Sequence, residues 1–274
     1  MYQVPEREYV EKGYWLPRTL GEELHEAAHK YAARTAVVAS DGTVTYEELD
    51  RLADEYAAGL ASLGIEAGGR GLVQLPNKLS LIIAVFALFR IGAIPIMALP
   101  ASRQADITAL CSLAEPVAYI TTDRSGSLEY GPTVDALKSN YSYLQHIITD
   151  NGGIEGTIPL KSLRKRGGKP PFKSFSFTDT ALLLLSGGTT GTPKLIPRRH
   201  TDYAYNARAA SERLSLCETD AYLVVLPAAH NFSLSAPGII GTFMHGGKVV
   251  LAGNIGPEEA FALIERERIT FTAL

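Results

Sequence analysis

The sequence is poor in cysteine and has almost no excess of either charge. Its 274 residues include two cysteines, Cys111 and Cys217, which excludes a disulfide framework and a four-cysteine zinc site. The 26 basic and 29 acidic residues leave a net charge of −3, so electrostatics gives no reason to expect nucleic acid or an anionic membrane as the main partner. The N-terminal sequence MYQVPEREYVEKGYW lacks the apolar region of a secretory signal. With 46% hydrophobic and 20% charged residues, the composition indicates a globular, cytoplasmic protein of one to two domains.

One apolar run, residues 79–99, approaches the length of a membrane span. Arg90 lies in its middle, and Pro95 interrupts any single helix through it. The run therefore predicts a buried helix over Leu79–Phe89, followed by a buried strand over Ala93–Leu99. We expect no membrane contact.

Short apolar strands alternate with helical patterns along the rest of the chain. The helix signal is clearest after Thr45, where Glu48 follows at the capping-box spacing and apolar residues recur at helical intervals up to Gly64. Strands separated by helices indicate parallel βαβ units, and hence an α/β fold with largely parallel sheets. The predicted strands in this part are Ala36–Ala39, Gly71–Leu75, Val117–Thr121 and Gln145–Ile148.

A Gly-, Pro- and Lys-rich stretch, Asn151–Lys173, predicts a surface connection between two parts, about 1–165 and about 172–274. The basic cluster Arg164–Arg166 within it is short and has no interleaved aromatic residue, which favours a solvated loop over a nucleic-acid patch. Near the end, Pro257–Arg268 predicts an amphipathic helix and Ile269–Leu274 a strand. A sequence that stops on an apolar strand is expected to be the front part of a longer protein.

The strongest chemical signal is the glycine- and threonine-rich loop SGGTTGTPK after the apolar strand Ala181–Leu185. Glycines let successive backbone N–H groups approach an anion, while threonine hydroxyls and a lysine add donors and charge, a combination that suits a polyphosphate. A Walker A loop is excluded, because two residues separate the last glycine from the lysine and a strand, not a helix, is expected next. A glycine-rich hairpin loop without a ligand is the alternative. The candidate phosphate-binding residues are Ser186, Gly187, Gly188, Thr189, Thr190, Gly191, Thr192 and Lys194.

A helix is expected only after this strand, from about Asp202, with Thr201 as its N-cap. Further along, the sequence PAAHNFSLSAPG follows the apolar strand YLVVLP, where a βα loop would open onto a ligand site. His230 taken alone is more often a structural histidine than a ligand-binding one. Asn231 beside it is able to accept or donate a hydrogen bond.

These motifs together resemble the adenylate-forming superfamily, which contains acyl- and aryl-CoA synthetases, luciferases and adenylation domains of nonribosomal peptide synthetases. SGGTTGTPK followed by LIPRRHTDY resembles its phosphate-binding signature, and VTYEELDRLADEYAAGLASLGIEAGGR and NKLSLIIAVFALFRIGAIPIMALP resemble its first core segments. LIPRRHTDY, PAAHNFSLSAPG and EKGYW are similar to one branch, the siderophore-type aryl-acid–AMP ligases, such as 2,3-dihydroxybenzoate–AMP ligase. The resemblance implies layered αβαβα subdomains in an incomplete N-terminal domain, without the C-terminal lid domain.

The resemblance also implies an activity. Such enzymes join an aryl carboxylic acid to ATP, with Mg²⁺, and pass the acyl group to a phosphopantetheine thiol on a carrier protein in siderophore, peptide or antibiotic biosynthesis. The loop Ser186–Lys194 would hold the β- and γ-phosphates, and no carboxylate cluster identifies a Mg²⁺ ligand. The catalytic lysine of the family would lie beyond residue 274. The implied substrate-binding residues are His230, Asn231, Ser235 and Ala236.

Two of these residues bear on the substrate. Asn231 matches the position where relatives that activate amino acids carry an aspartate, and a neutral amide suits a substrate without an α-amine. Ala236 stands where relatives that activate 2,3-dihydroxybenzoate have a serine, so the catechol substrate is in doubt within the aryl-acid class. Salicylate, 3-hydroxypicolinate and 3-hydroxyanthranilate remain candidates. An aryl-CoA ligase is the nearest alternative enzyme, and a non-catalytic adenylation fragment that acts as a binding module is an alternative of another class.

Overall fold

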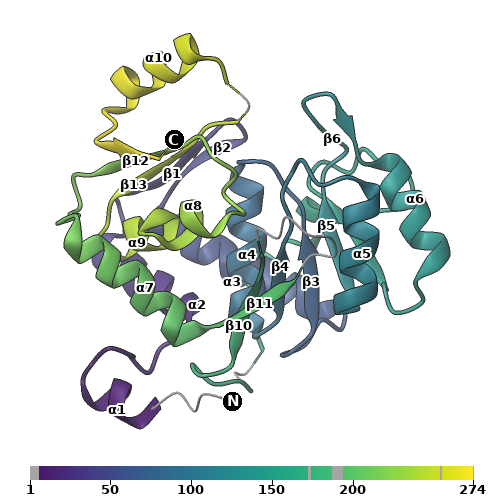
Figure 1. Cartoon of the computed structure of the whole chain (residues 1–274), viewed down its shortest axis with the longest axis horizontal. Helices are drawn as coiled ribbons and strands as arrows, with labels where there is room; N and C mark the ends of the chain where they lie inside the picture. The colour runs from purple at the N-terminus through teal and green to yellow at the C-terminus, as the bar shows by residue number, and fades with distance from the viewer. Residues whose placement is uncertain (1–5, 172–173, 187–193, 254, 274) are drawn as a thin grey trace.

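The computed structural model describes residues 6–171, 174–186, 194–253 and 255–273. Ten α-helices and fourteen strands lie within these ranges (Figure 1). The helices are α1 Glu6–Glu11, α2 Leu20–Tyr31, α3 Tyr46–Ser62, α4 Leu79–Ile91, α5 Gln104–Ala114, α6 Gly131–Asn140, α7 His200–Arg213, α8 Asn231–Ser235, α9 Gly238–Met244 and α10 Pro257–Glu267. The strands are β1 Thr35–Ala39, β2 Gly42–Thr45, β3 Arg70–Val73, β4 Ile94–Met97, β5 Ala118–Thr121, β6 Arg124–Ser125, β7 Leu128–Glu129, β8 His146–Thr149, β9 Ile158–Pro159, β10 Thr180–Leu185, β11 Leu195–Arg199, β12 Ala221–Val224, β13 Lys248–Leu251 and β14 Phe271–Thr272.

The strands form two large sheets and one small hairpin, β6–β7. One sheet has the order β14-β12-β13-β1-β2, and the other has the order β11-β10-β4-β3-β5-β8-β9. Neighbouring strands are parallel except at one edge of each sheet, where β2 and β11 run antiparallel to β1 and β10. The prediction of largely parallel sheets is therefore confirmed. Each sheet contains strands from before and after residues 165–172, because β1 pairs with β13 and β10 pairs with β4.

Three hydrophobic clusters lie between the layers of helices and sheets and pack them together. Alternate residues of a strand point to opposite faces of its sheet, so Val73 of β3 packs into the central cluster while Leu72 packs into another. The central cluster joins α2, α3 and α4 to the inner faces of both sheets. The second cluster packs α5 and α6 on the outer face of the seven-stranded sheet. The third packs Leu263 and Ile264 of α10 against Leu223 and Val250 of the five-stranded sheet. The order of layers is αβαβα, as the resemblance implied.

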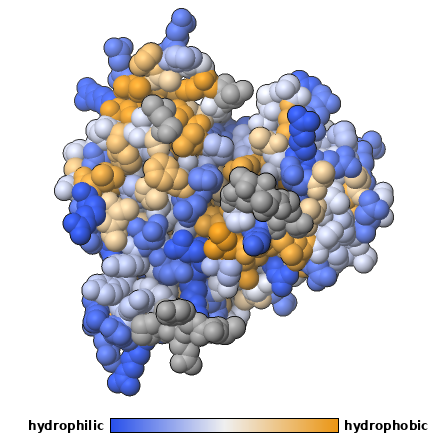
Figure 2. Space-filling model, viewed as in Figure 1, coloured by the Kyte–Doolittle hydropathy of each residue, from blue (hydrophilic) through white to orange (hydrophobic). Residues whose placement is uncertain are grey.

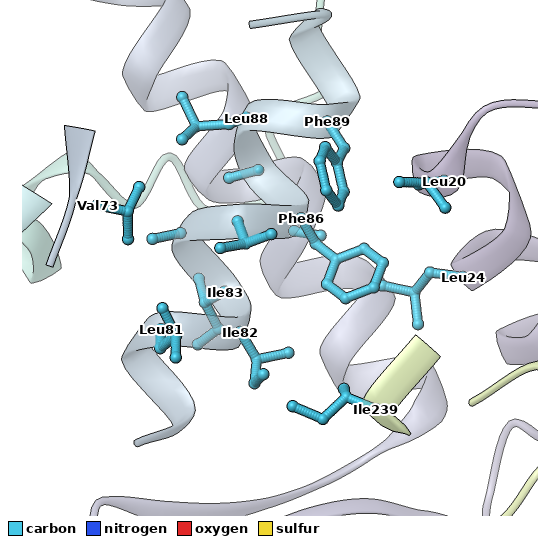
Figure 3. Packing of buried hydrophobic residues seen from close by; sticks show 14 of the residues in the cluster. Leu20, Leu24, Val73, Leu81, Ile82, Ile83, Phe86, Leu88, Phe89 and Ile239 are labelled. Atoms are coloured by element: carbon cyan, nitrogen blue, oxygen red, sulfur yellow. The ribbon is translucent and has the colours of Figure 1, made fainter. Parts of the chain in front are cut away.

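Helix α4 occupies the centre of this arrangement. Figure 3 shows its side chains, Phe86 and Phe89 among them, pointing toward Leu20 and Leu24 of α2 on one side, while others face Val73 of β3. A helix that is apolar all round is expected where every face meets protein, which explains the long apolar run without a membrane. The run divides at Gly92, whose φ of 70° ends α4 before β4 begins, so the predicted helix and strand are confirmed. Within the described residues, no helix combines the length and apolarity that crossing a membrane requires.

The outer layer over the five-stranded sheet is thin. All residues of α10 remain at least partly exposed, and Phe261 is 68% exposed. Figure 2 shows apolar surface around this helix, at the top of the view. The sequence predicted α10 to within one residue and placed β14 in a longer strand than the one found.

Local helix signals gave mixed results. The capping box of α3 is confirmed, because the Glu48 N–H donates to Thr45 Oγ1 at 3.2 Å and the Thr45 N–H donates to Glu48 Oε2 at 2.8 Å. The predicted start of α7 was wrong: the helix begins at His200, directly after β11, and Thr201 is a buried helical residue. The reason is tertiary, since the His200 and Thr201 N–H groups donate to the carbonyls of Asp179 and Phe177 and need no capping side chain.

The connection after β8 is fastened to α3 by its basic residues. Arg164 Nε donates to Glu55 Oε2 at 2.6 Å, and Lys169 Nζ lies 3.0 Å from Asp54 Oδ2. Burial alone would raise the pKa of Glu55, but hydrogen bonds from the Gly167 N–H, Arg164 and Arg51 outweigh it and lower the pKa to about 2. The cluster predicted as a solvated loop is thus anchored through Arg164, while Lys165 and Arg166 are exposed.

Candidate functional site

The base of the glycine-rich loop is a strand pair in the seven-stranded sheet. The Ser186 N–H donates to the Lys194 carbonyl at 2.9 Å, and the Lys194 N–H donates to Ser186 Oγ at 3.3 Å. Beyond them β10 and β11 pair antiparallel, so the strand predicted after the loop is present. The Lys194 residue is exposed. The other predicted phosphate contacts, Gly187, Gly188, Thr189, Thr190, Gly191 and Thr192, lie outside the described residues.

The His-Asn pair begins helix α8, after β12 of the other sheet. His230 is the N-cap, and its Nδ1 accepts a hydrogen bond from the Phe232 N–H at 3.3 Å. His230 and Phe232 are exposed, whereas Asn231 is half-buried. The Oδ1 atom of Asn231 is itself buried and has no hydrogen-bond partner within the described ranges. A buried amide oxygen without a donor is costly, so a donor that reached this atom would stabilise it.

Ser235 and Ala236 end α8, and they have different surroundings. The buried Ser235 Oγ donates to the Tyr203 carbonyl of α7 at 3.1 Å, while the Ser235 carbonyl accepts from Asn206 Nδ2. Its hydroxyl therefore fastens α8 to α7. Ala236 is half-buried and supplies a methyl group where a serine would supply a hydroxyl.

Sequence reasoning missed a polar side chain that connects the two sheets at this edge. Asn77, in the turn between β3 and α4, is buried, and its amide contacts the backbone after both β12 and β13. The available signal was a polar residue within QLPNK at the carboxyl end of a strand, where ligand sites of open α/β sheets lie. A second missed residue is Tyr203 of α7: it is fully buried, and burial raises its pKa.

A hollow of about 580 Å³ lies elsewhere, at the amino ends of β1, β12 and β13. It is lined by Thr35, Ala221 and Lys248, the first residues of those strands, and by the end of α10. Lys248 Nζ is paired there with Glu267 at 3.0 Å. Because the candidate residues follow the carboxyl ends of the strands, this hollow is not the site that they form.

A family model described as AMP-binding enzyme matches residues 24–274. The chain belongs to this family. AMP-binding enzymes of similar sequence include the 2,3-dihydroxybenzoate-AMP ligase of Bacillus subtilis, 42% identical over 267 residues, and the salicyl-AMP ligase / salicyl-S-ArCP synthetase of Mycobacterium tuberculosis, 41% identical over 271 residues. Triostin synthetase I of Streptomyces triostinicus is 43% identical over 267 residues. Each alignment covers 97% of this chain and 48% or 49% of the relative, so the chain spans about half the length of these relatives.

The structural comparison agrees. The apo structure of Mycobacterium smegmatis MbtA superposes with a TM-score of 0.93 at 40% identity, over 100% of this chain and 52% of that one. An anthranilate CoA ligase, AuaEII, has a TM-score of 0.83 at 21% identity, a likeness that concerns the fold alone. The predicted resemblance to adenylate-forming enzymes, and to their aryl-acid branch, is confirmed. The roles assigned to individual residues remain predictions.

Proposed function

We propose that the protein containing this chain is an aryl-acid–AMP ligase that joins a 2-hydroxyaryl carboxylic acid to ATP. Membership of the AMP-binding family implies the use of ATP. The aryl-acid class is supported by identities of 41% and 42% to ligases named for salicylate and 2,3-dihydroxybenzoate. Mg²⁺ would enter with ATP, since this ion is commonly bound through substrate phosphates and few protein carboxylates. No group of three metal-ligating side chains is found in the described part of the chain.

The proposed reaction needs no protein nucleophile. One carboxylate oxygen of the acid attacks the α-phosphorus of ATP, the bond from that phosphorus to the β-phosphate oxygen breaks, and pyrophosphate leaves with the electron pair. The product is a mixed anhydride, the aryl adenylate. Two anions must approach within bonding distance, so orientation and positive charge around the phosphates supply the catalysis. In this proposal Lys194 and the glycine-rich loop hold the β- and γ-phosphates.

The observation that carries the substrate class is the unpaired Oδ1 of Asn231. A hydroxyl ortho to the carboxylate would donate a hydrogen bond to this buried oxygen. Leaving such an acceptor unpaired costs about 1–3 kcal/mol, or about 5- to 150-fold in an equilibrium constant. An acid with the ortho hydroxyl is therefore preferred over the same acid without it. An ortho amine would also supply a donor, and 3-hydroxyanthranilate carries one.

The experiment is ATP–pyrophosphate exchange with the intact protein. The acids are salicylate, 2,3-dihydroxybenzoate, 3-hydroxypicolinate and 3-hydroxyanthranilate, with benzoate and 3-hydroxybenzoate as matched acids that lack the ortho donor. We expect kcat/KM for salicylate to exceed that for benzoate and 3-hydroxybenzoate by about 5- to 150-fold. Equal rates with benzoate would remove the role of Asn231. Absence of exchange with every acid would favour the non-catalytic binding module.

The acceptor of the acyl group is proposed to be the phosphopantetheine thiol of an aryl carrier protein. Its thiolate would attack the carbonyl carbon of the adenylate and release AMP, forming a thioester. One relative, at 41% identity, has a name that includes salicyl-S-ArCP synthetase, and another, at 39%, is named salicylyl-CoA synthase / salicylate adenylyltransferase, so each acceptor has a precedent among the relatives. Supplying holo carrier protein or CoA to the adenylate-loaded enzyme decides between them. Faster AMP release with CoA would make the protein an aryl-CoA ligase.

A further inference from the structure

The side chain of Asn77 is saturated by backbone groups. Its Nδ2 lies 3.1 Å from the Val224 carbonyl oxygen, 2.9 Å from that of Leu226 and 2.9 Å from that of Ala252. Its Oδ1 accepts from the Ala228 N–H at 2.7 Å. Only 7% of the residue is exposed. One buried amide thus contacts four backbone groups of other elements.

These backbone groups end strands of the five-stranded sheet or follow them, whereas Asn77 follows a strand of the other sheet. Val224 is the last residue of β12, and Ala252 directly follows β13. Asn77 follows β3, which lies beside β4 in the seven-stranded sheet, and β4 lies beside β10, the strand before Ser186. The Asn77 side chain therefore links two parts of the molecule. One is the seven-stranded sheet, from which the glycine-rich loop extends, and the other is the segment between β12 and His230.

The three residues that follow Asn77 make further hydrogen bonds to segments that follow β8 and β1. Lys78 Nζ donates to Asp150 Oδ2 at 2.9 Å, directly after β8. Asp41, after β1, accepts from the Leu79 and Ser80 N–H groups at 2.8 and 3.1 Å. A carboxylate is favourable at the N-terminus of a helix, so Asp41 also stabilises α4. The turn from Asn77 to Ser80 is held against both sheets.

We propose that Asn77 is a positioning residue for the adenylation step, which fixes the distance between the aryl-acid subsite at the start of α8 and Ser186 and Lys194, the described residues of the phosphate subsite. This inference rests on the proposed function. The two subsites follow strands of different sheets, and a misplacement of about 1 Å between reacting groups is able to cost about 100-fold in rate. Aspartate would lack the donor for the three carbonyls, glutamine is one methylene too long, and alanine would leave buried polar groups unpaired.

Gln74 provides a matched control at the end of the same strand. It is fully buried, and its Nε2 donates to the carbonyls of Leu99 at 3.1 Å and Ser102 at 2.8 Å. Its Oε1 accepts from the Tyr119 hydroxyl. All of these partners lie in or beside β4 and β5 of the seven-stranded sheet. Gln74→Ala therefore removes a comparable set of buried hydrogen bonds without releasing the loop before His230.

The test compares exchange kinetics of the wild type, Asn77→Ala, Asn77→Asp and Gln74→Ala in the intact protein, below the melting temperature of every variant. Helix α8 keeps its bond from Ser235 to α7 in every variant, so the start of the aryl-acid subsite stays attached to α7. We expect kcat to fall about 10- to 100-fold in both Asn77 variants, with the KM for ATP within about threefold of wild type. Gln74→Ala should keep kcat within about threefold. Equal losses in Gln74→Ala and Asn77→Ala, or wild-type kcat in Asn77→Ala, would overturn the proposal.

Hydrogen exchange separates this proposal from the proposed function. If the wild type catalyses no ATP–pyrophosphate exchange with any acid, the proposed function fails and Asn77 positions no adenylation step. If the wild type is active but reduced stability alone explains the kinetics of the Asn77 variants, hydrogen exchange at the Ala228 backbone amide decides whether Asn77 holds the loop. Its hydrogen exchange should be at least about tenfold faster in Asn77→Ala, or in Asn77→Leu where the alanine variant does not fold, than in Gln74→Ala, because alanine and leucine both lack the oxygen that accepts from this amide. Unchanged protection of that amide would show that Asn77 does not hold the loop.

Discussion

Glu55 should be one of the largest single polar contributors to stability, although it lies far from the candidate site in sequence. Its carboxylate is 3% exposed and receives hydrogen bonds from Arg164 at 2.6 Å, Gly167 at 3.0 Å and Arg51 at 3.1 Å. Glu55→Gln removes the charge and turns an N–H group toward at least one of these donors. A lowering of the pKa from 4.5 to about 2 corresponds to roughly 3 kcal/mol at about 1.4 kcal/mol per unit. Because Arg51 is half exposed and screened, we expect a loss of about 2–3 kcal/mol.

The pH dependence gives the prediction its sign. The pKa of Glu55 is depressed in the folded state, so its contribution is complete above about pH 4.5 and is lost as the pH falls toward 2. The difference in melting temperature between wild type and Glu55→Gln should therefore be largest near pH 7 and shrink steadily below pH 4.5. Thermal unfolding of both proteins from pH 7 to pH 3 measures it.

An exposed ion pair supplies the control. Arg124 and Glu129 lie 2.7 Å apart with side chains 64% and 62% exposed, so Glu129→Gln should cost less than about 1 kcal/mol. The reasoning is refuted if Glu55→Gln and Glu129→Gln have the same melting temperature at pH 7. It is equally refuted if the difference between Glu55→Gln and wild type stays constant down to pH 3.

Three further predictions concern the site and the core. Lys194→Ala should leave the melting temperature within about 2 °C of wild type but lower kcat/KM for ATP about 10- to 150-fold, because a charge-assisted contact of about 1.5–3 kcal/mol is lost; an unchanged kcat/KM contradicts it. Ala236→Ser should raise the exchange rate with 2,3-dihydroxybenzoate relative to salicylate by about 2- to 13-fold, the worth of one neutral hydrogen bond, and an unchanged ratio would place the ring elsewhere. Gly92→Ala should destabilise the protein by about 2–4 kcal/mol, because φ is +70° and the new Cβ would lie 2.4 Å from Phe175 Cδ1; wild-type melting would show that this contact relaxes.

The sequence predicted best those features that a few neighbouring residues decide. Thr45 and Glu48 lie three residues apart, so their mutual capping was visible in the sequence and is present in the structure. Helix α2 begins with the same arrangement, Thr19 and Glu22, a signal that was available and overlooked. The end of α4 at Gly92 was likewise local, because glycine adopts the left-handed conformation that ends a helix at little cost.

The start of α7 and the role of Asn77 were not predictable in this way. The carbonyls that satisfy the first N–H groups of α7 belong to Phe177 and Asp179, which precede the glycine-rich loop. The partners of Asn77 lie 147 to 175 residues away along the chain. A pattern of hydrophobic residues predicts which residues are buried but not which distant backbone groups meet them. The family resemblance supplied the motifs around His230 and Lys194 without supplying this contact.

The pairing of β1 with β13 affects how the chain folds during synthesis. Val37 pairs with Val249, so about 210 residues must be made after β1 before its parallel neighbour exists. At about 5–20 residues per second, a ribosome needs roughly 10–40 s for that stretch. Throughout that interval the β1–β2 hairpin has an open edge, and unpaired edges invite association with other chains. A nascent chain of this protein should therefore depend on chaperones that shield strand edges until β13 emerges.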